Sequence, residues 1–453
     1  MVDILPFRAW RYAPHLTPHI ESLTSPLFDV VSERQRERLY AEPLNSIHLS
    51  VPRADEGVSS AQAAAARLAD WKARGVIRQD ALPGLYVYYQ HYVLPGSDQV
   101  YVRKGFFAHL RLHEWAESVV RRHESTLPGA VDDRTDLLAA TRMHVSATHG
   151  LYTDPDFTLE ALMDESQQHP IYDTEDYQGV RDVLSVIHDR RVIARFVATL
   201  RAQPFLILAD GHHRYEASLA YRRRCLAERP DAPAAAPCHH HLMYLTNTEQ
   251  GGLRVLPTHR LIRGLPDFDA DRLPARLAED FTVRELESPY QVNEIIMGKP
   301  WAFGLIFRDR AYKIRLRPER LDTMTWNFPD DIRALDLTVL HYFVIERGLG
   351  IAGPQQRRSP HVAYERSFPT CLAEVQSGAA QAAVITNELT MDAIRRVCAG
   401  GHTLPPKSTY FYPKVICGFS FSSLVPDEFT YPTDPCLALA ASATPARNGG
   451  LSL

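Results

Sequence analysis

The residues best suited to chemistry lie where a short apolar segment meets a helix-like one. Pro204–Ala209 is long enough for a buried strand but too short for a helix, and Asp210-Gly211 ends it. Residues 212–224 then show a helical pattern. A glycine at such a turn lets the backbone approach a ligand closely, and a helix N-terminus presents N–H groups to an anion. This junction therefore predicts an anion-binding site.

The three residues after the turn, His212, His213 and Arg214, are potential cationic donors. With Gly211 at the bend, they favour phosphate as the anion. Asp210, at the strand end, could hold Mg²⁺ or the hydroxyl of a substrate. The alternative is an ordinary capped helix with exposed histidines, which the His-His-Arg sequence makes the weaker interpretation.

Arg121–Thr126 and the pair Asp133-Arg134 form a second polar cluster. His123 with Glu124 could act as an acid–base pair or as metal ligands. Arg134 could hold a phosphate or carboxylate through two hydrogen bonds. A solvated, charged helix end explains the same residues equally well.

A third segment, Pro405–Lys414, reads Pro-Pro-Lys-Ser-Thr-Tyr-Phe-Tyr-Pro-Lys. Lys407 followed by the hydroxyls of Ser408 and Thr409 has the chemistry of a contact to phosphate or to a magnesium nucleotide. The glycine-rich lead of a P-loop is missing, so the residues alone favour a rigid turn flanked by prolines. In Cys238–His241, alternating strand residues are a better interpretation than metal ligands.

Composition bounds the class of protein. A chain of 453 residues is expected to form two or three domains. The formal net charge of −4 gives no sign of a nucleic-acid partner. The six cysteines form no CxxC pair, which indicates reduced thiols in a cytoplasmic protein. No apolar run approaches the ~18 residues that would span a membrane.

Strand and helix patterns alternate without a regular βαβ order, which indicates an α+β fold. We expect an N-terminal domain over residues 1–245, a C-terminal domain over 246–435 and a disordered tail over 436–453. The expected helices cover 59–77, 110–124, 132–145, 212–224 and the segment from Asp336, as its cap, to Gly348. The expected strands cover 85–90 and 99–103, as a hairpin, and 204–209, 253–257, 301–307 and 312–315.

Taken in their order along the chain, the three clusters resemble motifs of the bacterial and archaeal domain-of-unknown-function family 1015. Members open with Pro-Phe-Arg, matched by Pro6–Arg8. Their Arg-His-Glu-x-Thr, Ala-Asp-Gly-His-His-Arg-Tyr and Pro-Pro-Lys-Ser-Thr-x-Phe-x-Pro-Lys segments are matched by Arg122–Thr126, Ala209–Tyr215 and Pro405–Lys414. The resemblance covers residues 4–420.

One departure from the family pattern bears on the substrate. Where the family has Pro-Pro-Tyr-Asp, this chain has Pro26-Leu27-Phe28-Asp29. The aspartate remains, but a tyrosine hydroxyl is missing. If that tyrosine contacts the substrate in relatives, the substrate of this chain differs.

The Asp-Gly-His-His-Arg turn is also similar to the phosphate-binding loop of the ParB/sulfiredoxin superfamily, which includes free-serine kinases. This resemblance implies a mixed-sheet domain with a ParB/sulfiredoxin-like strand–turn–helix core, next to a second α+β domain. It also implies that the loop holds nucleotide phosphates, while a carboxylate from an N-terminal segment takes the proton of the serine hydroxyl. Asp29 is the first candidate for that base and Glu124 the second.

The resemblance therefore implies a kinase that uses ATP or ADP with Mg²⁺ to phosphorylate a small hydroxylated metabolite, such as free L-serine or a related amino acid. Asp210 would bind Mg²⁺ or the hydroxyl, and His123 and Arg134 would contact the substrate. The phosphate and nucleotide contacts would come from Gly211, His212, His213, Arg214, Lys407, Ser408 and Thr409.

Two other functions stay open at this point. A metal-dependent hydrolase, such as a phosphatase, would use His123, Glu124, His212 and His213 as ligands. A nucleotide-switched binding protein that docks a partner would bind nucleotide without phosphoryl transfer to any small molecule. In each case we expect small-molecule ligands and neither a nucleic-acid nor a membrane partner, and the sequence is compatible with a homo-oligomer.

Overall fold

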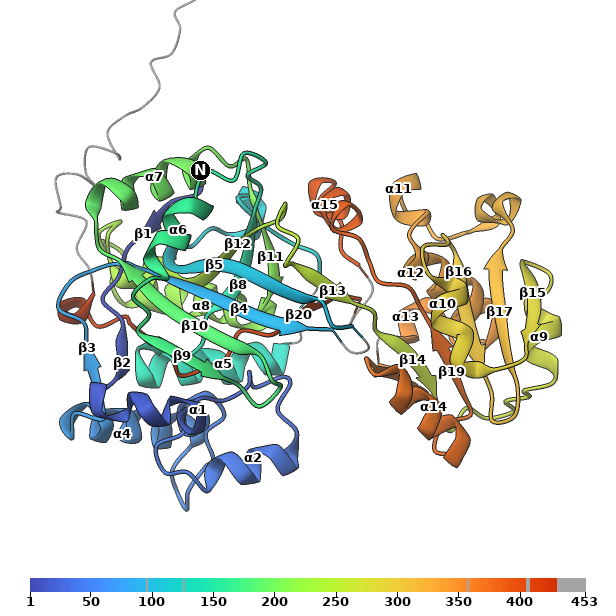
Figure 1. Cartoon of the computed structure of the whole chain (residues 1–453), viewed down its shortest axis with the longest axis horizontal. Coiled ribbons are helices and arrows are strands. Elements are labelled where there is room, and N and C mark those ends of the chain that lie inside the picture. Colours follow the sequence, from blue (N-terminus) through green and yellow to red (C-terminus); the bar gives the residue numbers. More distant parts are fainter. Residues whose placement is uncertain (95–96, 125, 127, 357, 405–407, 430–453) are drawn as a thin grey trace, which may run out of the picture. The chain divides into compact units, whose positions relative to one another are not determined.

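The chain forms two compact units, which we describe in a computed structural model (Figure 1). The structure describes residues 1–94, 97–124, 126, 128–356, 358–404 and 408–429. The first unit contains Met1–Arg122, Thr126–Leu253 and the segment from Pro413 onward, and the second contains His123–Ser125 and Arg254–Tyr412. The expected boundary at 245/246 lies near the crossing from Leu253 to Arg254. The return at Pro413 has no counterpart in the sequence pattern, and the expected tail, 436–453, lies outside the described residues.

The first unit is built on a mixed sheet, which confirms the α+β class. In the described part of this unit the sheet has nine strands, with two parallel neighbour pairs, β11–β6 and β12–β8. The order along the sheet is β6 (Val120–Arg122), β11 (Leu206–Asp210), β8 (Thr148–Tyr152), β12 (His240–Asn247), β5 (Val100–Arg111), β4 (Leu85–Val93), β10 (Arg181–Ile187) and β9 (Tyr172–Glu175), and β1 (Ile4–Leu5) also pairs with β5.

Both faces of this sheet are buried, and the alternation of side chains along β4 separates two cores. Tyr86 and Tyr88 point into one core, while Leu85 and Val87 point into the other. The first core also holds residues of the helices α4 (Ser60–Ala73) and α5 (Pro128–Thr141). The second holds residues of α7 (Arg190–Arg201) and α8 (His212–Glu228). The sheet is therefore a rigid support for the residues at the ends of its strands.

Several local predictions are confirmed. Ser59 begins α4 through a capping box with Gln62. The predicted hairpin is formed by β4 and β5, which pair in antiparallel register (Figure 1). The predicted helix at 132–145 is α5, shifted toward the N-terminus, and His240 and His241 begin strand β12 as expected.

The predicted helix at 110–124 is wrong. Strand β5 continues to Arg111, and only a short 3-10 turn, Trp115–Glu117, precedes β6. Leu110 pairs with Ile4 of β1 and with His241 of β12. These partners are distant in sequence, so pairing across the sheet overrides the local helical preference.

The second unit contains an antiparallel sheet, six-stranded in its described residues, in the order β15 (Phe281–Leu286), β17 (Ala311–Leu316), β16 (Ala302–Ile306), β19 (Ala382–Ile385), β14 (His259–Ile262) and β18 (Val362–Glu365). The predicted strands at 301–307 and 312–315 are β16 and β17. The strand predicted at 253–257 is β13 (Arg254–Leu256), which pairs with β20 (Tyr410–Tyr412).

The predicted helix after Asp336 is present as α12 (Asp336–Val339), continued by the π-helical segment Leu340–Gly348. The expected cap is wrong. Leu335 is the N-cap residue, and the Asp336 carboxylate accepts a hydrogen bond from the backbone N–H of Trp301 at 2.8 Å. Among the described residues, no helix combines the length and hydropathy needed to cross a membrane.

Candidate functional site

The predicted strand-to-helix turn is confirmed at Gly211. Strand β11 ends at Asp210, and α8 begins at His212 with Gly211 as its N-cap residue at a φ of 88°. A Cβ atom at this position would lie 2.7 Å from Cγ2 of Thr148. Both the positive φ and the close approach require glycine. The N-terminus of this 17-residue helix therefore follows directly on the end of β11, and its dipole favours an anion there.

The carboxylate of Asp210 binds two cations in the first unit. Its Oδ1 accepts a hydrogen bond from Nζ of Lys414, and its Oδ2 lies 2.9 Å from Nη2 of Arg214. All three side chains are at most 12% exposed. Burial alone would raise the pKa of Asp210, but the charges of Lys414 and Arg214 hold this pKa well below its usual range. The cluster is therefore ionised and has two cations for one carboxylate.

Arg214 is fixed by contacts on more than one side. Its Nη1 donates to the carbonyl oxygen of Ala147 and lies 3.3 Å from Oγ of Ser146. These bonds hold the guanidinium between α8 and the loop before β8, rather than leaving it directed at solvent. In this arrangement Arg214 contributes a buried, oriented positive charge. An incoming ligand would meet the cluster of Asp210, Lys414 and Arg214 as a preformed unit.

The two histidines of the turn differ in exposure. His212 is buried, while His213 is half-buried. His212 lies close enough to Asp210 to lower the pKa of that carboxyl. Beneath the turn, His149 pairs with Asp210 across the sheet and contacts Oγ1 of Thr246 at 2.8 Å through Nε2. Burial lowers the pKa of His149 well below its ordinary value, so this imidazole is neutral.

A small cavity of about 40 Å³ lies beside the next turn of α8. Its lining includes Arg214, Ser146 and Arg134, one of the predicted substrate contacts. Arg134 donates to the carbonyl oxygen of Ser50 at 2.6 Å and lies over the ring of Phe28 at 4.7 Å. The structure thus brings Arg134 and Arg214 to the same cavity.

Asp29, the first candidate for the base, belongs to the same region of the first unit. Burial raises the pKa of the Cys417 thiol to about 11, with Arg214 and Asp29 among the nearby charges that act on it. The Cys417 carbonyl accepts from Oγ of Ser46 at 3.1 Å. The N-terminal segment that carries Asp29 therefore approaches the side of the site where Arg214 lies.

The other predicted residues meet in the second unit. Nε2 of His123 lies 2.7 Å from Oγ1 of Thr409, although 286 positions separate them. His123 and Ser408 are buried, and Glu124 is half-buried. The second and third sequence motifs are therefore in direct contact. Lys407 lies outside the described residues, so its predicted role stays a prediction.

The structure gives one test of the metal predictions. Within the described ranges, we find no group of three or more His, Cys, Asp or Glu side chains arranged to hold a metal ion. Both oxygens of Asp210 already have a cationic partner. Asp210 as it stands therefore does not fit a Mg²⁺ ligand, and we assign no step to a metal there.

Lys414 is the residue whose place sequence reasoning missed. Lys414 is the last residue of the Pro405–Lys414 motif. The sequence favours Lys407 as the phosphate contact, because Lys407 precedes two hydroxyl side chains. The signal was the presence of two lysines in one motif. Only the folded chain shows that Lys414 contacts Asp210.

Comparison with known proteins places the chain in a family. Residues 4–338 match the family described as "Protein of unknown function (DUF1015)", and the chain belongs to this family. The match ends before the Pro405–Lys414 motif. No curated protein matches the chain.

Solved structures cover much of the chain at low identity. A conserved hypothetical protein from Pyrococcus furiosus is 12% identical with a TM-score of 0.33, covering 70% of this chain and 95% of that chain. A free serine kinase in complex with AMP is 11% identical with a TM-score of 0.35, covering 72% and 93%. SbnI with a C-terminal truncation, from Staphylococcus aureus, is 12% identical with a TM-score of 0.35, covering 68% and 84%.

Proposed function

We propose that this member of the DUF1015 family is a nucleotide-dependent kinase that phosphorylates a small hydroxylated metabolite, an amino acid such as free L-serine. The observation that carries the proposal is the cluster at the start of α8. Two buried cations, Lys414 and Arg214, share one carboxylate next to the N-terminus of a long helix. This combination is built to receive the negative charge of a phosphate chain.

Each part of the cluster has a role in the proposed reaction. The N–H groups of His212 and His213 bind the phosphates, and Arg214 and Lys414 neutralise the charge that develops on the transferred group. Asp210 is a positioning residue, since it holds both cations in place. Arg134, which lines the same cavity as Arg214, contacts the amino acid in this proposal.

The transfer itself needs one base. The substrate hydroxyl oxygen attacks the terminal phosphorus of ATP or ADP, and the bond from that phosphorus to its bridging oxygen breaks. The hydroxyl proton moves to the carboxylate of Asp29. Mg²⁺ enters bound to the nucleotide. Since both oxygens of Asp210 are engaged, no protein ligand is assigned to it.

The proposal is tested by incubating the protein with ATP or ADP, Mg²⁺ and a panel of hydroxylated amino acids, followed by ³¹P NMR. We expect a phosphomonoester signal that needs both the nucleotide and one amino acid. Asp29→Asn should lower the rate by at least about 100-fold. The matched control is Asp136→Asn, which changes a carboxylate that is 62% exposed and should leave the rate unchanged.

Three other results would overturn the proposal in different ways. Release of inorganic phosphate without an acceptor would indicate the hydrolase. Nucleotide binding by calorimetry without transfer to any acceptor would indicate the nucleotide-switched binding protein. Absence of nucleotide binding would exclude both the kinase and the switch.

A further inference from the structure

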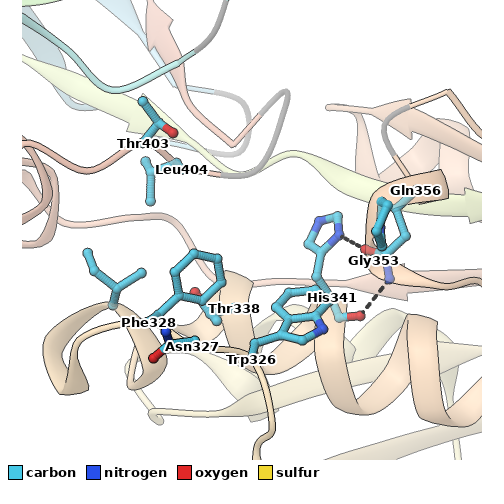
Figure 2. A pocket seen from close by; sticks show the side chains of 11 residues that line it. Trp326, Asn327, Phe328, Thr338, His341, Gly353, Gln356, Thr403 and Leu404 are labelled. Atoms are coloured by element: carbon cyan, nitrogen blue, oxygen red, sulfur yellow. Dashed lines mark hydrogen bonds between the residues drawn. The ribbon is translucent and has the colours of Figure 1, made fainter.

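A second cavity, of about 450 Å³, lies within the second unit, in the size range of small-molecule sites (Figure 2). Figure 2 shows Trp326, Phe328 and His341 on one side and Thr403 and Leu404 on the other. The remaining lining residues are Asn327, Ile332, Thr338, Gly353, Pro354 and Gln356. None of these residues belongs to the site proposed for phosphoryl transfer.

The aromatic wall of this cavity is held in place by contacts within the unit. The indole N–H of Trp326 lies 3.3 Å from both carboxylate oxygens of Glu346. The Trp326 ring also packs edge-on against Tyr342, at 5.4 Å, and Phe328, at 6.0 Å. Because its polar edge is satisfied inside the protein, the indole offers the cavity an apolar, polarisable surface. Such a surface fits a planar aromatic ring.

The polar wall contains a histidine whose protonation is fixed. Nε2 of Gln356 donates to the carbonyl oxygens of His341 and Ile351, each at 2.9 Å, which leaves its Oε1 as an acceptor. Nδ1 of His341 lies 2.6 Å from that oxygen and must donate to it, as the dashed line in Figure 2 marks. Nε2 of His341 is then the acceptor for Nη2 of Arg260 at 3.0 Å. The imidazole is therefore neutral and oriented.

Arg260, behind this histidine, places a positive charge inside the unit. The side chain is fully buried. Its other contacts are the carbonyl oxygen of Thr258 and the ring of Tyr364, at 5.1 Å. Among the residues that the structure describes, Arg260 forms no ion pair, and its Nε has no partner. A buried guanidinium without a carboxylate is unfavourable, and an anion placed nearby offsets that cost.

We propose that this cavity binds a small aromatic carboxylate, with its ring against Trp326 and its carboxylate on the side of His341 and Arg260. The hydroxyl of Thr338, which lines the cavity, supplies a hydrogen bond to the carboxylate. Since His341 already accepts from Arg260, the positive charge acts on the ligand through space. Two independent features point to the same ligand: the aromatic wall selects the ring, and the buried charge selects the anion.

Isothermal titration calorimetry with the full chain tests the proposal, with indole-3-acetate, its neutral amide indole-3-acetamide, and acetate as probes. We expect indole-3-acetate to bind at least about 10-fold more tightly than the amide, as interactions with a charged group allow. Acetate, which lacks the ring, should not bind measurably. Equal affinity for the carboxylate and the amide, or binding of neither, would overturn the proposal.

Variants separate the two walls. Trp326→Leu should weaken both aromatic probes, while Arg260→Met should remove only the preference for the carboxylate. The matched control, Tyr290→Leu, changes an aromatic residue of the same unit that is 68% exposed and should alter neither affinity. If Arg260→Met does not fold, Thr338→Val gives the second test, with a loss of about 10-fold for the carboxylate and a smaller loss for the amide, because a hydrogen bond to a charged group is the stronger one. If a folded Arg260→Met or Thr338→Val variant still preferred indole-3-acetate over indole-3-acetamide to the same extent, the proposed role of the replaced residue would be wrong.

Discussion

Nζ of Lys414 donates a hydrogen bond to Oδ1 of Asp210, across 204 positions of sequence. The side chains are 9% and 12% exposed, so water screens this pair weakly. Asp210 keeps a second partner in Arg214 at 2.9 Å. Lys414 therefore adds a second cation to the loop that the sequence marks as reactive.

Replacing Lys414 with methionine should destabilise the protein by about 3 kcal/mol, because it leaves a buried carboxylate with one cation fewer. Urea unfolding measures this loss. The matched control is Lys104→Met, which breaks an ion pair with Asp164 whose side chains are 30% and 49% exposed. That change should cost less than about 1 kcal/mol. Equal costs for the two variants would mean that the Lys414 pair contributes no more than a surface pair.

Arg214→Ala should lower turnover by at least about 100-fold, because oriented charge at a phosphoryl group typically supplies about 3 kcal/mol or more. Arg214→Lys should recover little, since one ammonium group cannot reach Asp210, Ala147 and Ser146 together. Turnover and melting temperature are measured on the same samples. A lower melting temperature with normal turnover would show that Arg214 only braces the turn.

Gly211→Ala should destabilise the protein by about 1–3 kcal/mol, because the new Cβ atom would meet Thr148 at a positive φ. The control is Gly129→Ala in α5, where a Cβ meets nothing within 4 Å. Alanine there should be neutral or stabilising by up to about 1 kcal/mol. Thermal unfolding compares the two. If Gly211→Ala and Gly129→Ala behave alike, the turn at the start of α8 is less constrained than the structure indicates.

Stability should fall as the pH drops below about 6.5, because the first unit buries neutral histidines. Burial lowers the pKa of His144 and His240 to about 4. It also lowers the pKa of His109, His149 and His241 well below the ordinary value of a histidine. These histidines stay neutral in the folded state but bind protons once unfolded, so their stabilisation is full above about pH 6.5 and is lost toward pH 4. The five histidines considered are His109, His144, His149, His240 and His241.

Urea unfolding at pH 7.5, 6.5 and 5.5 measures this dependence. Each histidine should contribute about 1.4 kcal/mol per pH unit within that window. His144→Gln should reduce the slope by about one proton. A slope that does not change in this variant, or stability that is constant from pH 7.5 to 5.5, would contradict the assignment.

Local sequence signals predicted the elements that local forces build. Ser59 and Gln62 cap α4 by contacts within one turn, and Gly211 marks a bend that only glycine accepts. The stretch from Leu110 failed because its partners, Ile4 and His241, come from other strands. No local pattern indicates such pairings.

The candidate site shows the same division. The turn at Gly211 was predictable because strand end, glycine and helix start follow one another. The contact of Lys414 with Asp210, and that of Thr409 with His123, depend on how distant segments meet. The sequence gives no sign that Arg260 is buried. The burial of an arginine, and its lack of a carboxylate partner, depend on residues that surround it only in the folded chain.

The return of the chain to the first unit at Pro413 has a consequence for synthesis on the ribosome. Strand β21 (Ser422–Ser423) pairs with β7 (Met143–His144), and Phe421 forms a bridge with Trp10. The residues that close the first unit are thus translated after the whole of Arg254–Tyr412. The second unit can fold before the ribosome has made the last segment of the first unit, which begins at Pro413. A messenger truncated after residue 412 would yield a nascent protein whose Asp210 lacks one of its two counter-charges.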